Sequence, residues 1–123
     1  MMKVRGVRGA TTCEANTVEA ILEATTELLQ ALIDANGIQE DDVASIFFTT
    51  THDLTACFPA RAARDMGWRY TALLGATEMN SDEGVPMCIR ALIHWNTERR
   101  LEDLIHVYLR GAVALRPDFS RTT

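Results

Sequence analysis

The sequence is poor in cysteine and has no long apolar run. Its three cysteines, Cys13, Cys57 and Cys88, are odd in number, far apart and without any CxxC spacing, so neither a disulfide framework nor a cysteine zinc site is expected. We interpret them as reduced, mostly buried thiols. No apolar stretch approaches the ~20 residues of a membrane span, and residues 1–6 lack the apolar segment of a signal peptide. We therefore expect a cytoplasmic protein with no membrane partner.

Motifs for nucleophilic, phosphate-transfer or metal-dependent chemistry are missing as well. The chain has no GxSxG elbow, no phosphate-binding loop ending in Gly-Lys-Ser/Thr, no HExxH and no GxGxxG. The three histidines, His52, His94 and His106, have no metal-ligand spacing, and we interpret them as surface or satisfied polar residues. A net charge of −5 is not that of a general nucleic-acid binder. We expect no metal, no cofactor and no nucleic acid, but a local group of arginines could still hold a small anion.

What is present is an ordinary globular composition, with 47% hydrophobic and 24% charged residues. A chain of 123 residues is long enough to bury about two-thirds of its unfolded surface in one domain. We therefore expect residues 1–123 to form a single domain. Pro117 interrupts the pattern near the end of the chain, and residues 116–123 are expected to be a flexible polar tail.

Apolar spacing predicts three helices, over residues 16–36, 59–66 and 86–97. In the first, Asn16 and Glu19 resemble a capping box, and Gly37 supplies a left-handed stop. In the second, Pro59 occupies the first helical position and Gly67 ends the helix. The third is apolar almost all round.

Residues rich in β-branched and aromatic side chains predict five strands, over residues 3–12, 44–50, 68–74, 106–110 and 112–115. The stretch 44–50 has the composition of a central strand, and the last two strands would form a hairpin joined at Gly111. The expected fold class is α+β, a mixed sheet with helices on one face. The opposite face would be exposed, and packing against copies of the chain would bury it, which favours a homo-oligomer.

Arginines are the clearest candidates for binding an anion. Arg5 and Arg8 lie three residues apart on the first strand and therefore on opposite faces, so at most one can reach a common site. We favour Arg8, because the missing side chain of Gly9 would let a ligand approach. Arg61 and Arg64 share a face of the second helix, which is mildly unfavourable unless an anion lies between them. A solvated basic edge is the simpler alternative.

Arg90 is the only charge in the apolar stretch 85–93. A helix of this composition is buried, and a buried guanidinium must be paired. Its candidate partners are a ligand carboxylate or the acids of the preceding loop, Glu78, Asp82 and Glu83. The alternative is an outward stripe of Arg90, His94 and Thr97.

Tyr108 alternates with Val107 and Leu109 and is equally compatible with the core and with a site. Together these residues suggest a pocket for a small carboxylate anion, lined by several arginines and one glutamate. Arginine binds a carboxylate through two parallel hydrogen bonds, so such a cluster is specific as well as attractive.

At these positions the chain resembles the trimeric chorismate mutases. The matching segments are residues 5–12, 58–64, 78–79, 89–90, 106–109, 112–113 and 115–118. They follow the family's order over nearly the whole chain. The resemblance implies a homotrimer whose sheets form a barrel-like core, and a cytoplasmic isomerase of the shikimate pathway and aromatic amino-acid biosynthesis. It would convert chorismate to prephenate by an intramolecular Claisen rearrangement, through positioning and electrostatic stabilisation.

The resemblance also implies active sites in clefts between subunits. One subunit would supply Arg8, Glu78, Arg90 and Tyr108, and its neighbour Phe58, Arg61 and Arg64. Arg8 and Arg64 would hold substrate carboxylates, with a weaker contribution from Arg61. Arg90 would reach the ether oxygen, Tyr108 would steady that arrangement, and Glu78 would accept a hydrogen bond from the ring hydroxyl.

The C-terminal part of the resemblance implies that Leu115, Arg116 and the tail help close the cleft. Gly75 departs from the family, because relatives can place a small polar or thiol side chain there, close to the substrate hydroxyl. Two alternatives stay open. One is a small trimeric enamine/imine deaminase, which has a similar architecture; the other is a non-catalytic trimer that binds a small acid.

Overall fold

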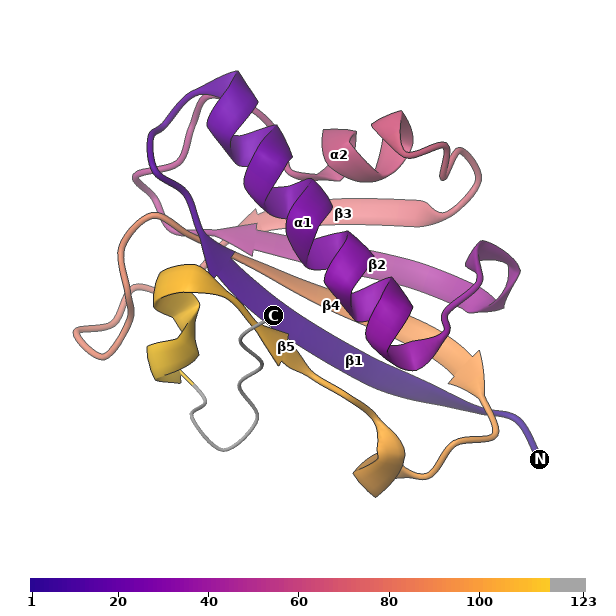
Figure 1. The fold of residues 1–123 in the computed structure, drawn as a ribbon. Coiled ribbons are helices and arrows are strands. Elements are labelled where there is room, and N and C mark those ends of the chain that lie inside the picture. The colour runs from indigo at the N-terminus through magenta and orange to yellow at the C-terminus, as the bar shows by residue number, and fades with distance from the viewer. Residues whose placement is uncertain (116–123) are drawn as a thin grey trace.

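The chain builds a five-stranded mixed sheet and packs its two α-helices against one face of it (Figure 1). The strands are β1 (Lys3–Thr12), β2 (Val43–Thr50), β3 (Ala72–Thr77), β4 (Cys88–Thr97) and β5 (Val107–Tyr108), and the helices are α1 (Val18–Asn36) and α2 (Ala60–Asp65). The strand order is β3-β2-β4-β1-β5. Both edge strands pair in parallel, and the two inner pairings are antiparallel. This computed structural model describes residues 1–115, and it confirms the expected α+β class.

Short 3₁₀ helices cover Glu40–Asp42, Leu101–Asp103 and Arg110–Leu115. None of the helices formed by residues 1–115 combines the length and the hydrophobicity that a membrane span requires. The predicted tail, residues 116–123, lies outside the described part of the chain.

α1 confirms the first predicted helix, with one correction at its start. The side chain of Thr17, and not that of Asn16, accepts the capping hydrogen bond, from the Ala20 N–H at 3.1 Å. Gly37 ends the helix as predicted, in a left-handed conformation with φ +72°, and its N–H bonds to the Ile33 carbonyl. Such a conformation costs glycine little, because it has no Cβ.

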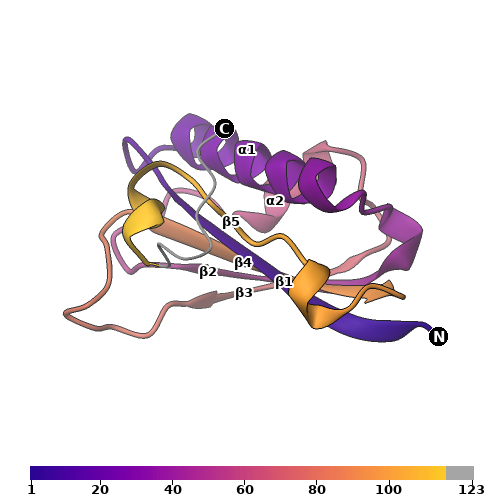
Figure 2. The ribbon, with the colours of Figure 1, turned by 60° about the horizontal axis from the view of Figure 1, so that its bottom comes forward.

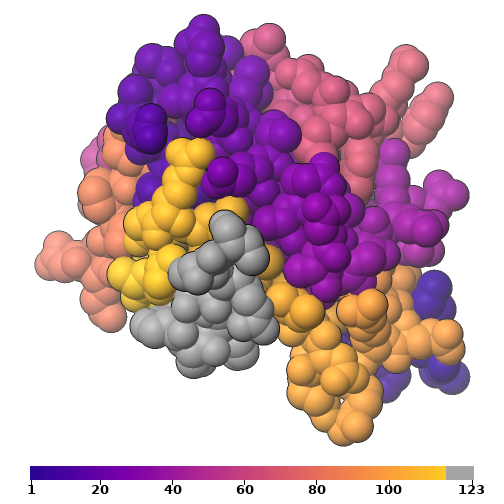
Figure 3. All heavy atoms as spheres, viewed as in Figure 1, coloured from indigo at the N-terminus to yellow at the C-terminus, as the bar shows by residue number. Residues whose placement is uncertain are grey.

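The main core lies between the helices and the sheet. α1 packs on β1 and on α2, and Figure 3 shows it crossing the middle of this face. Its leucines Leu28 and Leu32 are fully buried and cluster with Val7, Phe48 and Ile93 of the sheet. Burial of each such side chain is worth about 1.5–3 kcal/mol, so the packing of α1 fixes which face of the sheet is covered.

The predicted third helix is wrong, because residues 88–97 form β4, the middle strand. Burial alternates along it: Ile89, Ala91 and Ile93 are buried toward the helices, while Leu92 is exposed on the other face. A strand paired on both sides and covered by helices can read as a nearly continuous apolar run, which periodicity alone does not distinguish from a buried helix. The stretch 44–50, predicted to be central, is the inner strand β2 beside it.

The predicted terminal hairpin is also wrong. β5 has only two residues and pairs in parallel with β1, and the chain then turns into the 3₁₀ helix 110–115. The positive φ of this turn, +51°, lies at Arg110 and not at Gly111. The Gly111 N–H instead donates to Thr12 Oγ1 at 3.1 Å. A single connecting residue is shorter than the two-residue loop that a tight hairpin uses.

Two other predictions hold with shifted bounds. The helix predicted over 59–66 is α2, shorter by one residue at each end. The strand predicted over 68–74 begins four residues later, at Ala72, and continues to Thr77. The missing start is explained by Trp68, whose N–H bonds to the Ala63 carbonyl and whose side chain packs on the core below α2.

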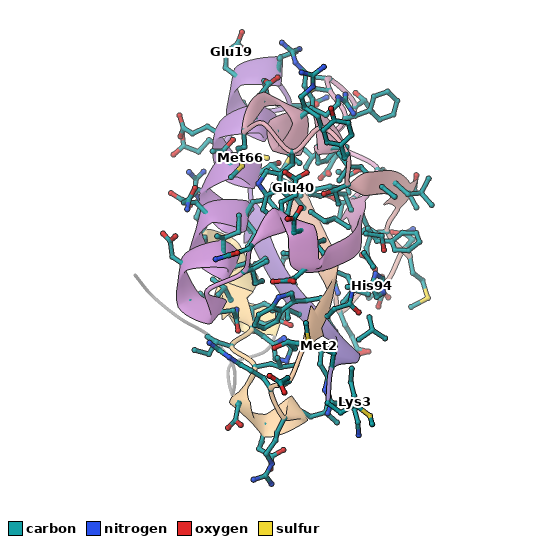
Figure 4. The ribbon with its side chains drawn as sticks, turned by 90° about the vertical axis from the view of Figure 1, so that its right-hand side faces the viewer. Met2, Lys3, Glu19, Glu40, Met66 and His94 are labelled. Atoms are coloured by element: carbon teal, nitrogen blue, oxygen red, sulfur yellow. The ribbon has the colours of Figure 1, made fainter. Side chains whose placement is uncertain are left out.

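Neither α1 nor α2 covers the second face of the sheet (Figure 2), and apolar side chains are exposed there. Val4, Phe47, Leu74 and Leu92 are 58%, 41%, 58% and 36% exposed. His94 projects from the same face, away from α1 (Figure 4), and its ring packs edge-on against Phe47 at 5.8 Å between centroids. We call this surface the open face; its composition is that of a surface that another protein surface covers.

The expectation that the missing side chain of Gly9 would let a ligand approach is wrong. A Cβ at Gly9 would lie 2.6 Å from the Val107 carbonyl oxygen and 2.9 Å from a Leu28 methyl group. Its missing side chain therefore makes room for β5 and α1 on the covered face. Arg8, the preceding residue, points to the open face, where it lines a hollow with Phe47 and Leu92.

Candidate functional site

Strand pairing brings the candidate side chains of β1 and β4 to the open face. Arg90 lies directly between Ala10 of β1 and Thr49 of β2, and Arg8 lies opposite Leu92, one row away. Side chains two residues apart share a face of a strand, so Arg8 and Arg90 face the same side. Arg5 lies on the other face, as predicted, and its Nε bonds to the Arg99 carbonyl.

Arg90 pairs with Glu78, one of the partners expected for it. Their Nε and Oε1 atoms are 3.3 Å apart, and the two side chains are 26% and 19% exposed. The Nε atom is buried, and its N–H is not aligned for a hydrogen bond to the carboxylate. Thr49 holds the same carboxylate oxygen, because its hydroxyl donates to Glu78 Oε1 at 2.5 Å. The pair is thus fixed from two sides.

Arg8 and Tyr108 form the second part of the cluster. The Arg8 guanidinium carbon lies 6.0 Å from the centroid of the Tyr108 ring, and the backbone N–H of Arg8 donates to His106 Nδ1. Tyr108 is fully buried, and its hydroxyl has no hydrogen-bond partner within residues 1–115. No ion pair of Arg8 occurs in that part of the chain either. A guanidinium without an internal carboxylate and a buried hydroxyl donor suit a small anion.

Two hollows meet at the Arg90–Glu78 pair. The larger, of about 570 Å³, lies between the loop that precedes β4 and the C-terminal 3₁₀ helix, and Leu115 lines it. The smaller, on the open face, is lined by Arg8, Phe47 and Thr49. A cavity of this size accommodates a small molecule. Glu78 and Arg90 line both hollows, and Asp53 and Glu83 add two further carboxylates to the larger one.

The start of β4 is fixed by a clasp between two loops. Asp53 accepts from the Thr51 hydroxyl at 2.5 Å and from the Met87 N–H at 3.0 Å. Thr51 also accepts from the Cys88 N–H at 2.9 Å. Met87 has a positive φ of 55°, which costs roughly 1–2 kcal/mol for a residue with a Cβ. We call these contacts the β4 clasp. They fix a strained residue directly before β4, three positions from Arg90.

The remaining predicted residues lie elsewhere on the chain. Phe58 and Gly75 line a separate hollow between the loop 54–59 and β3, and the Phe58 side chain is 77% exposed. Arg61 and Arg64 lie on the exposed side of α2, where Arg61 pairs with Asp65 at 3.7 Å. One chain therefore brings together Arg8, Glu78, Arg90, Tyr108 and Leu115. Phe58, Arg61, Arg64 and Gly75 do not join this cluster. Arg116 lies outside the described residues.

The cysteines add no reactive group to the cluster. Burial raises the pKa of the Cys13 thiol to about 11 and also raises that of Cys88, so both are protonated at neutral pH. Cys57 is only partly buried. All three are free, as the sequence suggested.

Sequence reasoning missed Thr49, Thr51 and Asp53. Thr49 lies two residues from Phe47 on β2 and lines the same hollow, so alternation along the predicted strand 44–50 could have placed the two side chains on one face. The β4 clasp left no comparable signal, because its partners are 34 residues apart in the chain and meet only when β4 is a strand.

Comparisons with known proteins agree on one family. Residues 4–119 match the family model of chorismate mutase type I. The chorismate mutase AroH of Thermus thermophilus is 50% identical over 116 residues, which cover 94% of this chain and 95% of the relative. The corresponding enzyme of Bacillus subtilis (strain 168) is 41% identical over 122 residues, covering 98% and 96%. A solved chorismate mutase from Clostridium thermocellum superposes with a TM-score of 0.86 at 47% identity, covering 89% of this chain and 97% of its own.

The β4 clasp makes acid stability depend on Asp53. The Thr51 hydroxyl, followed by the Met87 N–H, holds the pKa of the Asp53 carboxyl below its ordinary value of 3.8. Its stabilising effect is therefore full above that value and is lost as the pH falls below it, through the lower folded-state pKa. Asp53→Asn should lower Tm by a constant amount between about pH 5 and 8, and the difference from the parent should shrink below about pH 4.

Thermal unfolding at these pH values measures the effect. Asp82→Asn, which neutralises an exposed carboxylate in the neighbouring loop, should not reproduce it. A difference between Asp53→Asn and the parent that persists unchanged to about pH 2 would contradict this role for the ionised carboxylate.

Proposed function

The chain belongs to the chorismate mutase type I family, and we propose that its active sites are clefts which two subunits of a homotrimer build together. The protein is a chorismate mutase, an isomerase of aromatic amino-acid biosynthesis that rearranges chorismate to prephenate. Membership of this family sets aside the deaminase alternative. A cytoplasmic location is part of the proposal, and the three free cysteines are compatible with a reducing compartment.

The observation that carries the proposal is the division of the candidate residues into two separate groups. Arg8, Glu78, Arg90 and Tyr108 gather on or beside the open face, whereas α2 packs on the covered face near β3, and Phe58, just before it, lines the hollow beside β3. We call the first group the Arg90 half and the second, Phe58 with Arg61, Arg64 and Gly75, the Phe58 half. A second subunit that supplied its Phe58 half to the Arg90 half would complete the site.

The open face supports the same arrangement. Its exposed apolar side chains come from four strands, from Val4 on β1 to Leu74 on β3. Burying them against copies of the same sheet would stabilise an assembly by about 25 cal/mol for each Å² removed from water. In a closed trimer the open faces would form a shared barrel-like core, and the edge strands would meet at the subunit boundaries.

The reaction explains why the site contains no nucleophile and needs no acid–base pair. In a Claisen rearrangement one C–O bond breaks as a C–C bond forms, within one molecule and without proton transfer. The enzyme must hold the compact chair conformation of chorismate, which is a positioning effect. It must also stabilise the negative charge that grows on the ether oxygen, and one preorganised donor is worth about 3–4 kcal/mol in such a role.

Arg90 is assigned to that ether oxygen, and Glu78 to the ring hydroxyl, from which it accepts a hydrogen bond. The Arg90–Glu78 pair keeps the guanidinium in place before substrate binds, so little reorganisation is needed during the reaction. Arg8 holds one substrate carboxylate, steadied by the ring of Tyr108, and Arg64 of the neighbour holds the other. Arg61 contributes less, because Asp65 already partly neutralises it. Leu115 and Arg116 help close the cleft, and Gly75 offers no side chain to the substrate hydroxyl.

Replacing Arg90 tests the assignment of the ether-oxygen donor. Arg90→Ala should lower kcat by about 100- to 1000-fold, the scale for losing a preorganised oxyanion donor. Arg90→Lys keeps the charge without the planar fork and should restore only part of the rate. Glu78→Gln keeps an acceptor for the ring hydroxyl and should cost less than Arg90→Ala.

The loss of chorismate ultraviolet absorbance measures these rates, and sedimentation confirms the assembly. An Arg90→Ala protein that assembles normally and keeps kcat within a few-fold of the parent would show that another group serves the ether oxygen. A parent protein that binds chorismate without turnover would favour the non-catalytic alternative.

Mixing variants tests the shared site. Arg90→Ala and Arg64→Ala each damage one half of the site, on different sides of the proposed interface. After dissociation and random reassembly of equal amounts, about a quarter of the interfaces should unite two intact halves, and activity should rise accordingly. Arg8→Ala mixed with Arg90→Ala is the control, because both lesions lie on the same half and no recovery is expected. Absence of recovery in the first mixture, with subunit exchange demonstrated, would mean that each site lies within one subunit.

A further inference from the structure

The side chain of Asn16 holds a loop that is distant in the sequence. Its Oδ1 accepts from the N–H groups of Thr55 and Ala56, at 2.9 and 3.0 Å. Its Nδ2 donates to Thr55 Oγ1 at 2.9 Å. The carboxamide oxygen of Asn16 and one of its amide N–H groups therefore bind two neighbouring residues of the loop 51–58.

Asn16 is not needed to begin α1, since Thr17 supplies the capping oxygen. Hydrogen bonds between exposed groups contribute little to stability, and this side chain is exposed. Three bonds to one segment nevertheless determine where that segment lies. The sequence singled out Asn16 as a helix cap, and the structure gives its side chain a different set of partners.

The segment that Asn16 holds leads directly into the Phe58 half. Ala56 is two residues from Phe58, whose carbonyl accepts from the Arg61 N–H at 3.1 Å in the first turn of α2. The other end of the loop is held by the contacts of Asp53 with Met87 and of Thr51 with Cys88, the first residue of β4. Asn16 therefore helps to fix the loop close to its junction with α2, together with the packing of Leu54 and Cys57 against the core below it.

We propose that Asn16 is a positioning residue for the reaction, which sets the loop 55–58 and the first turn of α2 so that Phe58 and Arg64 meet the substrate bound by the neighbouring subunit. The inference rests on the shared site of the proposed function. Asn16 touches no substrate; it acts through the placement of the Phe58 half. Small displacements of binding groups are costly, because a misplacement of about 1 Å can reduce a rate 100-fold.

Two substitutions separate this role from a general effect on stability. Asn16→Ala removes all three hydrogen bonds. Asn16→Asp keeps an acceptor for both N–H groups, and the Thr55 hydroxyl can rotate to donate to it. Thr17→Ala is the matched control, because it removes the cap of the adjacent helix and lowers stability without touching the loop.

Steady-state kinetics with chorismate are the first measurement. Asn16→Ala should lower kcat/KM by roughly 5- to 20-fold, mostly through KM, because binding groups are displaced while Arg90 stays in place. Asn16→Asp should recover most of the loss, and Thr17→Ala should keep KM within two-fold of the parent despite a lower Tm. A kcat/KM of Asn16→Ala within two-fold of the parent, or an equal loss in Asn16→Asp, overturns the proposal.

Mixed assemblies then locate the defect, with activity measured at chorismate concentrations below KM. Asn16→Ala mixed with Arg90→Ala should recover, because about a quarter of the interfaces combine an intact Phe58 half with an intact Arg90 half. Asn16→Ala mixed with Arg64→Ala should not, because every Phe58 half is then damaged. Recovery in the second mixture overturns the proposed role of Asn16 and leaves the shared site intact. Failure of the Arg90→Ala and Arg64→Ala mixture overturns the shared site, and the role of Asn16 with it.

Discussion

The Arg90–Glu78 ion pair is the contact on which the candidate site depends. It places a guanidinium and a carboxylate side by side, each largely removed from solvent, where a cation can stabilise developing charge without reorganisation. Its position follows from the sheet. β4 is the middle strand and is paired on both sides. The backbone of Arg90 therefore cannot shift without disturbing its register with Ala10 and Thr49. The rigid element in the centre of the fold thus carries the charge that the reaction uses.

The unequal covering of the sheet determines what a single chain can do. Helices cover one face, so the odd-numbered residues of β1 and β4 build the core and the even-numbered ones, Arg8 and Arg90 among them, face outward beside uncovered apolar side chains. The Phe58 half lies apart from Arg8 and Arg90, around α2 and the hollow beside β3. A chain of this design has two incomplete half-sites and an apolar surface, and self-assembly would resolve both deficiencies at once. Stability and catalysis would then depend on the same interfaces.

The sequence predicted the fold class, α1 and the pairing of Arg90 with an acid, because these depend on local periodicity and on the cost of an unpaired charge. It did not predict β4, whose central position makes its pattern resemble a buried helix. Glu78 was nevertheless among the candidate partners left open for Arg90, and the structure selects it, since burial of the charge does not depend on the type of element. The contacts of Asn16 and Asp53 were beyond sequence reasoning, because both link loops that meet only in the folded sheet. The roles of the site residues came from the family resemblance and stay predictions.

The central claim is that this site works by placing fixed charges around the substrate, without moving a proton. The most direct measurement is kcat at saturating chorismate as a function of pH. Arginines keep their charge throughout the accessible range, so kcat should be nearly constant between about pH 6 and 9, and chelators should have no effect. A bell-shaped profile centred near neutrality would contradict the account, since it would require a group that gains or loses a proton during the reaction.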